Sequence, residues 1–208
     1  MSGRDATLAR IRAALGGGAP VPSIPRNYRL RGGLEPAAAE SLFAERVADY
    51  RATVHSTDAS GLPALIAAVL AGAGHTRVVV PSGLPADWLA DLSDLGVVND
   101  DGRLSTSDLD RVDAVVTGCA VAIAETGTIV LDAGPDQGRR VLTLLPDHHV
   151  CVVSAERIVA TVPEGLARLD PTRPLTMISG PSATSDIELT RVEGVHGPRN
   201  LYVIILAG

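Results

Sequence analysis

The sequence is poor in aromatic residues and has no basic tract, and these shortages exclude one class of partner. Aromatic residues make up 2% of the 208 residues, as one Trp, one Phe and three Tyr, and the net charge is −6. A nucleic-acid-binding domain needs a basic surface and stacking aromatic side chains, so we expect no nucleic-acid partner. The hydrophobic fraction of 46%, with so few aromatics, predicts an aliphatic core.

Cysteines and long apolar runs are also scarce. Cys119 and Cys151 lie in apolar segments, and no C-x-x-C pair occurs. An iron–sulfur cluster usually takes four thiolates, so we expect no cluster and no metal in this chain. Two reduced, buried thiols indicate a cytoplasmic protein. No apolar run approaches the ~20 residues of a membrane span, and the charged N-terminus does not resemble a signal peptide.

The common catalytic motifs are missing as well. No G-x-G-x-x-G follows an expected strand, and the chain has no Walker A, G-x-S-x-G or H-E-x-x-H sequence. Nucleotide binding, serine hydrolysis and zinc proteolysis therefore have no motif support.

The segments that are present predict an N-terminal arm and one α/β domain. Leu8, Ile11 and Leu15 recur at helical spacing, glycines end this helix, and a Pro/Gly-rich linker follows, so residues 1–35 form the arm. We expect residues 36–208 to form a single domain that begins with a helix at 36–51.

Short apolar runs predict the strands of this domain. They are continuous rather than alternating, which indicates burial on both faces and a mostly parallel sheet covered by helices. The expected strands are 52–56, 76–81, 113–118, 127–132, 149–155, 175–180 and 201–206, and further helices are expected at 62–72 and 85–92. Open sheets of this kind bind ligands at the carboxyl ends of their strands. We expect the loops 81–85, 117–127 and 179–186 to meet there.

Glu125 is the single charged residue in the apolar stretch 118–131, where Gly118 and Gly127 bracket it. A glutamate that is desolvated at a sheet edge is suited to acid–base catalysis. Glu125 is therefore the candidate catalytic residue, expected to be partly buried and to face a pocket shared with residues 179–185 and His149. The alternative is that Glu125 caps a backbone amide or pairs with an arginine.

A loop rich in small polar residues follows the strand expected at 175–180. Ser185 and Glu188 match the S-x-x-E capping box that starts a helical turn. Capping does not explain the density of small polar residues at Ser179, Gly180, Ser182 and Thr184, which also suits a loop that binds a carboxylate or phosphate.

The adjacent arginines Arg139 and Arg140 are a second candidate group for binding an anion. Their guanidinium groups can hold a carboxylate or phosphate through paired hydrogen bonds. The alternative is a solvated loop in which one arginine pairs with Asp132 or Asp136.

The histidines give a weaker signal. His148 and His149 are adjacent, and neighbours on a strand point to opposite faces, so they make a poor metal site. His196 and Arg199 lie in a Gly/Pro turn before the last expected strand. This turn is either structural or closes over the same edge.

Several ordered stretches resemble the lactate utilization protein C family, whose members share the LUD domain. They are "TGCAVAIAETGTIVL", "LLPDHHVCVV", "TMISGPSATSDIE" and "EGVHGPRNLYVIIL", and they span about residues 113–206. The resemblance implies a fold similar to the sugar-phosphate isomerase and CoA-transferase superfamily. It also implies a role in oxidising L-lactate to pyruvate together with iron–sulfur partner proteins. Larger members carry C-x-x-C-x-x-C clusters, and this chain resembles the short subunit that lacks them.

The resemblance also implies site residues. The family's AETGT motif falls on residues 124–128, its SGPS and SDIE motifs on 179–182 and 185–188, its GVHGPR motif on 194–199, and its histidine on His149. The candidate ligand contacts from all these arguments are Gly118, Thr126, Gly127, Thr128, Arg140, His149, Ser179, Gly180, Ser182, Ser185, His196 and Arg199. A small carboxylate or phosphate is the expected ligand.

Different classes of function stay open. The chain is a subunit of a lactate-oxidising system, a stand-alone enzyme of the isomerase or CoA-transferase kind, or a module that binds a metabolite without turning it over.

Overall fold

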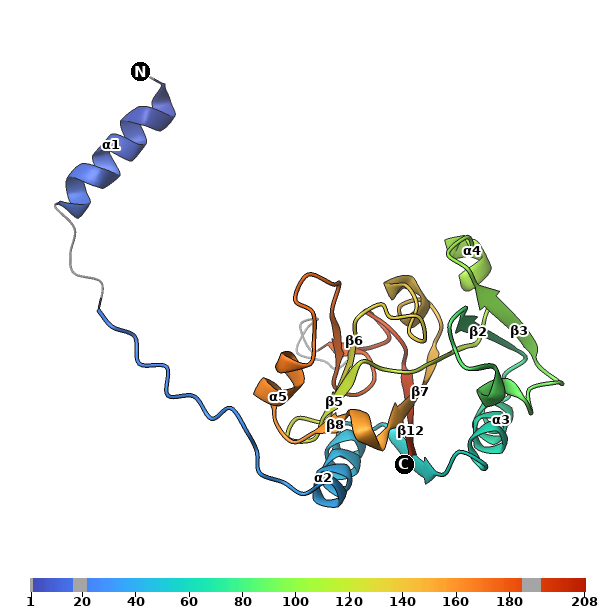
Figure 1. Cartoon of the computed structure of the whole chain (residues 1–208). Helices are drawn as coiled ribbons and strands as arrows, with labels where there is room; N and C mark the ends of the chain where they lie inside the picture. The colour runs from blue at the N-terminus through green and yellow to red at the C-terminus, as the bar shows by residue number, and fades with distance from the viewer. Residues whose placement is uncertain (1, 17–21, 185–191) are drawn as a thin grey trace.

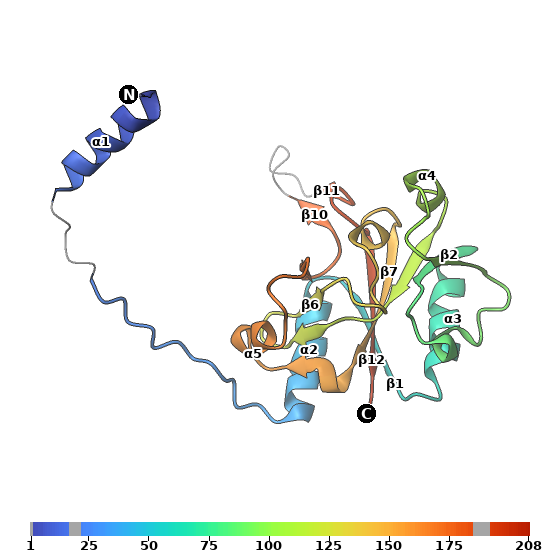
Figure 2. The ribbon, with the colours of Figure 1, turned by 45° about the horizontal axis from the view of Figure 1, so that its top comes forward.

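A computed structural model describes residues 2–16, 22–184 and 192–208. Helix α1 (Gly3–Leu15) begins at a capping box formed by Ser2 and Asp5, and none of its side chains is buried. Residues 22–35, which we call the strap, are extended and lead to helix α2 (Pro36–Asp49). In both views α1 and the first part of the strap lie away from the rest of the chain (Figure 1, Figure 2).

The main sheet is entirely parallel, with the strand order β1-β12-β7-β4-β2-β3 among the described residues. Its strands are β1 (Thr53–Thr57), β2 (Arg77–Pro81), β3 (Gly96–Asp100), β4 (Ala114–Thr117), β7 (His148–Ser154) and β12 (Asn200–Leu206). The inner strands are rich in valine and isoleucine and are buried on both faces. The predicted α/β fold with a mostly parallel sheet is confirmed.

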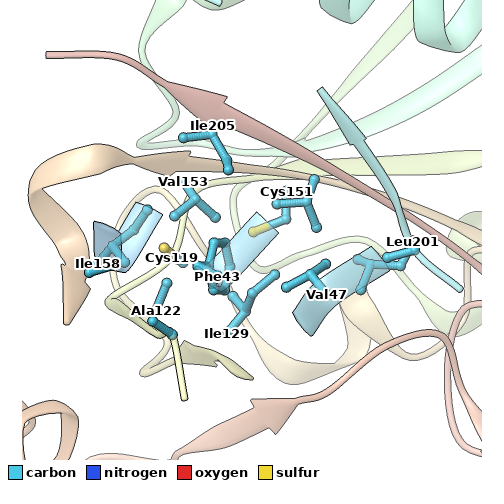
Figure 3. Close-up of a cluster of buried hydrophobic side chains, with 14 of the residues drawn as sticks. Phe43, Val47, Cys119, Ala122, Ile129, Cys151, Val153, Ile158, Leu201 and Ile205 are labelled. Atoms are coloured by element: carbon cyan, nitrogen blue, oxygen red, sulfur yellow. The ribbon is translucent and has the colours of Figure 1, made fainter. Parts of the chain in front are cut away.

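Helices cover both faces of this sheet (Figure 2). On one face, α3 (Leu62–Gly72) buries Leu62, Ile66 and Leu70 against β2, β4 and β7, beside the 3₁₀ helix η1 (Ala86–Leu89). On the other face, α2 buries Phe43 and Val47. Figure 3 shows Phe43 in the middle of this second cluster, close to both cysteine side chains.

A second sheet packs on the same face as α2. Its order is β8-β5-β6-β9, with β6 antiparallel to both neighbours. The strands are β5 (Val121–Ile123), β6 (Thr128–Leu131), β8 (Ile158–Val159) and β9 (Thr176–Ile178). Ala122 and Ile129 join the core around Phe43 (Figure 3), and Val121, Ile123 and Val130 pack in a separate cluster on the far side.

The assignment of 127–132 and 175–180 to the parallel sheet is therefore wrong. These segments are β6 and β9 of the second sheet, and β5 and β6 form an antiparallel hairpin with a short turn. The hairpin is buried on both faces, so it shows the same continuous apolar run as a parallel strand. Periodicity alone does not separate the two cases.

Short elements complete the fold. They are α4 (Thr106–Leu109), η2 (Arg140–Thr143), η3 (Ala155–Arg157), α5 (Val162–Ala167), β10 (Ala183–Thr184) and β11 (Val192–Glu193), of which β10 and β11 pair antiparallel. Both cysteines are buried free thiols, as expected. Within the described ranges, no helix has the length and apolar character needed to cross a membrane.

Candidate functional site

A cavity of about 200 Å³ lies beside the amino ends of β7 and β12, on the face that carries the second sheet. It brings together six of the residues singled out in the sequence: Arg140, His149, Ser179, Gly180, Ser182 and His196. Pockets for drug-sized ligands run from roughly 300 to 1,000 Å³, so this volume suits a small ligand.

The expected meeting of loops at the carboxyl edge of the sheet is wrong. The 81–85 loop sits at the carboxyl end of β2, where Gly83 donates to the Pro135 carbonyl at 3.2 Å. Residues 179–183 instead line the cavity near the amino ends of β7 and β12. The reason is that β9, which leads into 179–183, belongs to the second sheet rather than to the parallel one.

His149 is the most deeply buried polar side chain that lines the cavity. It is 1% exposed, and its Nε2 lies 2.7 Å from the Thr117 hydroxyl oxygen at the end of β4. Burial, and to a smaller extent the positive charge of Arg140, lowers the pKa of His149 to about 4. The imidazole is therefore neutral at pH 7, and one of its two nitrogens is a hydrogen-bond acceptor.

Arg140 supplies the positive charge. Its Nη1 donates to the carbonyl of Thr143 at 2.8 Å and to the Thr143 hydroxyl at 3.1 Å, and its Nη2 donates to the His196 carbonyl at 3.4 Å. These partners are neutral oxygens, and no carboxylate pairs with Arg140 in the described part of the chain. The guanidinium is thus held in place with its charge uncompensated.

Arg139, its neighbour, has a different role. It forms two hydrogen bonds to the Asp100 carboxylate, at 2.9 and 2.8 Å. The two arginines therefore do not form one clamp. The alternative of a pair with Asp132 or Asp136 is also wrong, because these carboxylates contact Arg173 and Arg157.

Hydroxyl groups connect the cavity wall to the β5–β6 turn. Thr126 and Thr128 share a hydrogen bond of 2.7 Å, and Thr128 lies 2.8 Å from the Ser179 hydroxyl. Ser182 accepts from the His196 amide at 3.0 Å through its side chain. The serine loop and the turn that contains His196 are thereby joined across the cavity.

The bracketing glycines serve close packing rather than ligand approach. A Cβ at Gly118 would collide with the Asp136 carboxylate, and Gly127, at φ +58°, lies against the backbone of Arg46. Neither residue lines the cavity. Ser185, and Glu188 with which it was predicted to form a capping box, lie outside the described residues.

Glu125 does not line the cavity either. It occupies the β5–β6 turn, its side chain is 44% exposed, and its carboxylate is ion-paired with Arg29 of the strap. The expectation of a partly buried Glu125 facing a pocket shared with His149 is wrong, and the alternative of an arginine partner is confirmed. Its cation lies far away in the sequence, so the residues around Glu125 carry no sign of the pair.

A larger cavity of about 820 Å³ borders the turn that contains His196. Its lining includes Arg199, which is paired with Asp147 at 3.3 Å. His148 lines it, so the prediction that the adjacent histidines face opposite sides is confirmed. The rings of His75 and His148 are 4.2 Å apart, and each has one buried nitrogen without a partner among the described atoms. Burial lowers the pKa of both histidines.

The model of the LUD domain matches residues 45–206. The chain belongs to the LUD domain family. Lactate utilization protein C of Deinococcus radiodurans is 50% identical over 203 residues, which cover 96% of this chain and 93% of the relative. Lactate utilization protein C of Geobacillus thermodenitrificans is 28% identical over 178 residues, 76% of this chain and 72% of the relative.

A solved structure shares the LUD domain fold. The crystal structure of a DUF162 family protein from Deinococcus radiodurans matches with a TM-score of 0.71 and 47% identity, covering 84% of this chain and 99% of that chain. The arrangement of sheets described above is therefore a fold already seen in a close relative.

Two residues of this LUD domain site were missed in the sequence. Thr117 and Thr143 contact His149 and Arg140, and both are buried. Thr117 had a visible signal, since it is the polar residue at the end of the apolar strand β4. No group of three or more His, Cys, Asp or Glu side chains within the described ranges is placed to hold a metal ion.

Proposed function

We propose that this chain is a cytoplasmic subunit of an L-lactate utilization system, in which it binds lactate or pyruvate while iron–sulfur partner proteins carry the electrons. The observation that carries the proposal is the uncompensated guanidinium of Arg140 in a small cavity beside neutral His149. The 50% identity to a protein named Lactate utilization protein C supports the same substrate.

The geometry suits a short monocarboxylate. An arginine with spare donors binds a carboxylate through charge-assisted hydrogen bonds, which are stronger than neutral ones. The Ser179 and Ser182 hydroxyls and the His149 ring add neutral hydrogen-bonding groups around it. A cavity of about 200 Å³ leaves little room for a larger acid.

The partner assignment follows from the thiols. Two buried cysteines are too few for the four thiolates of a usual iron–sulfur cluster. Electrons removed from lactate therefore need carriers on other chains, which supports placing the clusters in partner proteins.

A growth experiment tests the role in the cell. Deleting the gene in its host is expected to abolish growth on L-lactate as sole carbon source, while growth on pyruvate continues. Complementation with the natural chain restores growth and complementation with Arg140→Gln does not. Normal growth of the deletion strain on L-lactate, with no other lactate dehydrogenase present, overturns the proposal.

Glu125 was the candidate catalytic residue for the alternative of a stand-alone isomerase or CoA-transferase. Because Glu125 is ion-paired with Arg29 and does not line the cavity, that alternative no longer has a candidate catalytic residue. A module that binds a carboxylate without turnover uses the same cavity. Titration of the purified chain with lactate, followed by an assay for pyruvate with and without the partner proteins, distinguishes a binding module from a subunit that needs its partners.

A further inference from the structure

The N-terminal arm and the rest of the chain carry opposite charges. Residues 1–35 contain six arginines and two acidic residues, a net charge of +4. Residues 36–208 contain 12 arginines and 22 acidic residues, a net charge of −10. The arm is therefore attracted to an acidic surface of the kind that the domain itself presents.

Helix α1 of this arm has an apolar stripe that the described chain does not bury. The stripe consists of Leu8, Ile11 and Leu15, of which Ile11 is 50% and Leu15 is 71% exposed. A helix of 13 residues is marginal in water on its own, and most helices in proteins are stabilised by packing an apolar face against another element. A surface that covers the stripe would therefore stabilise α1.

Two arginines lie on the same face of α1 as the apolar stripe. Arg4 and Arg12 are four residues before and after Leu8, and residues at this spacing share one side of a helix. Arg10 is only two residues from Leu8 and lies on the opposite side. The face of α1 that carries the stripe is thus apolar and basic, and it is complementary to a surface that is apolar and acidic.

The larger cavity, of about 820 Å³, has apolar walls. Its apolar lining residues are Val112, Leu144, Leu145 and Val195. Leu144 is 40% exposed and Val195 is 43% exposed, so part of this wall is open to solvent. The volume lies in the upper part of the ~300–1,000 Å³ range of ligand pockets, so the cavity has room for several side chains from one face of a helix.

The same cavity is acidic. Its charged lining residues are Asp110, Asp113, Asp147 and Arg199, which give a net charge of −2. Burial lowers the pKa of His75 and His148, so these two lining residues are mostly neutral at pH 7 and do not offset the carboxylates. The lining is therefore complementary to α1 in both polarity and charge.

The strap directs the arm away from its own domain. From Arg29 onward it is fixed in place, because Arg29 pairs with Glu125 and the Gly32 amide donates to Glu164. Residues 22–28, which precede these anchors, are exposed and lead away from the domain in both views (Figure 1, Figure 2). The larger cavity lies at the amino ends of β4 and β7, where Asp113 and Asp147 precede these strands.

We propose that this chain forms a dimer by exchange of arms, in which α1 of each copy packs its apolar and basic face into the larger cavity of the second copy. A second copy supplies the acidic and apolar surface that α1 lacks on its own side of the strap. Two such contacts reinforce each other, because the first makes the second effectively intramolecular. His196 lines both cavities, so each exchanged arm lies next to the smaller cavity of the other copy.

Sedimentation equilibrium of the full natural chain tests the oligomeric state. A dimer is expected at low salt. It is expected to weaken between about 0.1 M and 1 M salt, because the screening length falls from about 10 Å to about 3 Å over this range. A chain that stays monomeric at low salt overturns the proposal, and this includes the case in which α1 folds back into the cavity of its own domain.

A matched pair of variants tests the face of α1. Arg12→Glu is expected to raise the dimer dissociation constant at least about tenfold, because like charges then face each other at both contacts. Arg10→Glu makes the same charge change on the opposite side of the helix and is expected to leave the dissociation constant unchanged. Both residues are exposed on the arm, so neither variant endangers the fold of the domain.

A second matched pair tests the cavity. Asp110→Arg is expected to weaken the dimer as Arg12→Glu does, whereas Asp94→Arg, at an exposed position outside the lining, is expected to have no effect. An equimolar mixture of the Arg12→Glu and Asp110→Arg chains restores opposite charges at both contacts. This mixture is expected to form a heterodimer although each variant alone is mainly monomeric.

Other interfaces and occupants give different results. A dimer that either Arg12→Glu or Asp110→Arg leaves intact has its interface elsewhere and overturns the proposal. A basic and apolar helix also suits an anionic membrane surface. A natural chain that stays monomeric and floats with phosphatidylglycerol vesicles, but not with phosphatidylcholine vesicles, shows that the arm binds lipid and overturns the proposal as well.

Discussion

Glu125 is ion-paired with Arg29, which lies 96 residues earlier in the chain. The pair ties the strap to the turn of the β5–β6 hairpin. Gly32 extends the attachment, because its amide donates to the Glu164 carboxylate at 3.1 Å and its backbone lies against Ala160 and Thr161. The carboxylate that the sequence pointed to as a catalytic group thus holds the strap.

Glu125→Gln is expected to loosen the strap and leave the cavity unaffected. Both side chains are more than two-fifths exposed, so the free energy of unfolding should fall by only about 0.2–1 kcal/mol. Trypsin should cut the strap faster, since it carries Arg26, Arg29 and Arg31. Lactate binding should be unchanged. Glu45→Gln removes the same charge from an exposed part of α2 and serves as control; loss of lactate binding in Glu125→Gln alone would contradict this view.

Substitutions of the adjacent arginines Arg139 and Arg140 are expected to affect different properties. Loss of Arg139 should lower the stability of the fold, and loss of Arg140 should remove carboxylate binding. Asp100, whose side chain is 3% exposed, depends on Arg139 for its charge partner. Arg139→Met leaves that carboxylate buried and unpaired, which should cost roughly 3–5 kcal/mol of folding free energy. Arg140→Gln should cost little stability and abolish carboxylate binding. Urea unfolding measures the folding free energy of both variants, and calorimetry measures their carboxylate binding. A loss of folding free energy of equal size in the two variants would contradict the prediction.

Acid is expected to destabilise the protein before its carboxylates titrate. The pKa of His149 falls from its ordinary 6.5 to about 4 on folding, and burial also lowers the pKa of His75 and His148. The unfolded chain therefore binds protons that the folded chain does not. The resulting stability is complete above pH 6.5 and is lost as the pH falls from there toward 4.

His149 alone should account for about 2 kcal/mol of stability lost between pH 7 and pH 5. Urea titrations at intervals of half a pH unit measure this slope. In His149→Gln, which removes the titrating group, the slope should be shallower although the stability at pH 7 is lower. An unchanged slope in that variant would show that His149 does not stay neutral in the folded protein.

Gly180 is expected to be intolerant of any side chain. It adopts φ +85°, and a Cβ there would lie 2.6 Å from the Cβ of Tyr50 and 2.8 Å from its carbonyl oxygen. Gly74 is a matched control, because it adopts φ +73° with nothing within 4 Å. Gly74→Ala should cost about 1 kcal/mol from backbone strain alone. Gly180→Ala should cost clearly more and weaken lactate binding, as measured by thermal unfolding and calorimetry.

Local pattern was enough to predict most of the parallel sheet. The helix expected at 62–72 coincides with α3, and the strands at 52–56, 76–81 and 201–206 coincide with β1, β2 and β12 within a residue or so. These segments bury apolar side chains at the spacing that their own secondary structure dictates. β3 was missed because its sequence, Gly-Val-Val-Asn-Asp, is only partly buried at the edge of the sheet.

The sequence predicted several residues that line the cavity, but it did not predict where in the fold the cavity lies. Arg140, His149 and Ser179 were each recognised from residue type or family motif, and they do meet. Their meeting place depends on β9 crossing to a second sheet, a long-range pairing with no local signature. The same limit applies to Glu125, because its partner lies on the strap. The division at residue 35 and the kinship with the isomerase and CoA-transferase superfamily stay predictions.

The position of β12 has a consequence for how the protein is made. β12 follows every other described strand in the sequence, yet it lies between β1 and β7 and is the strand that β1 pairs with. While a ribosome still holds residues 200–206, β1 has no neighbour and β7 exposes one hydrogen-bonding edge. Open edges of this kind invite pairing with other chains. The nascent chain is therefore expected to be aggregation-prone until β12 has left the ribosome, and chaperones that shield strand edges should raise its yield.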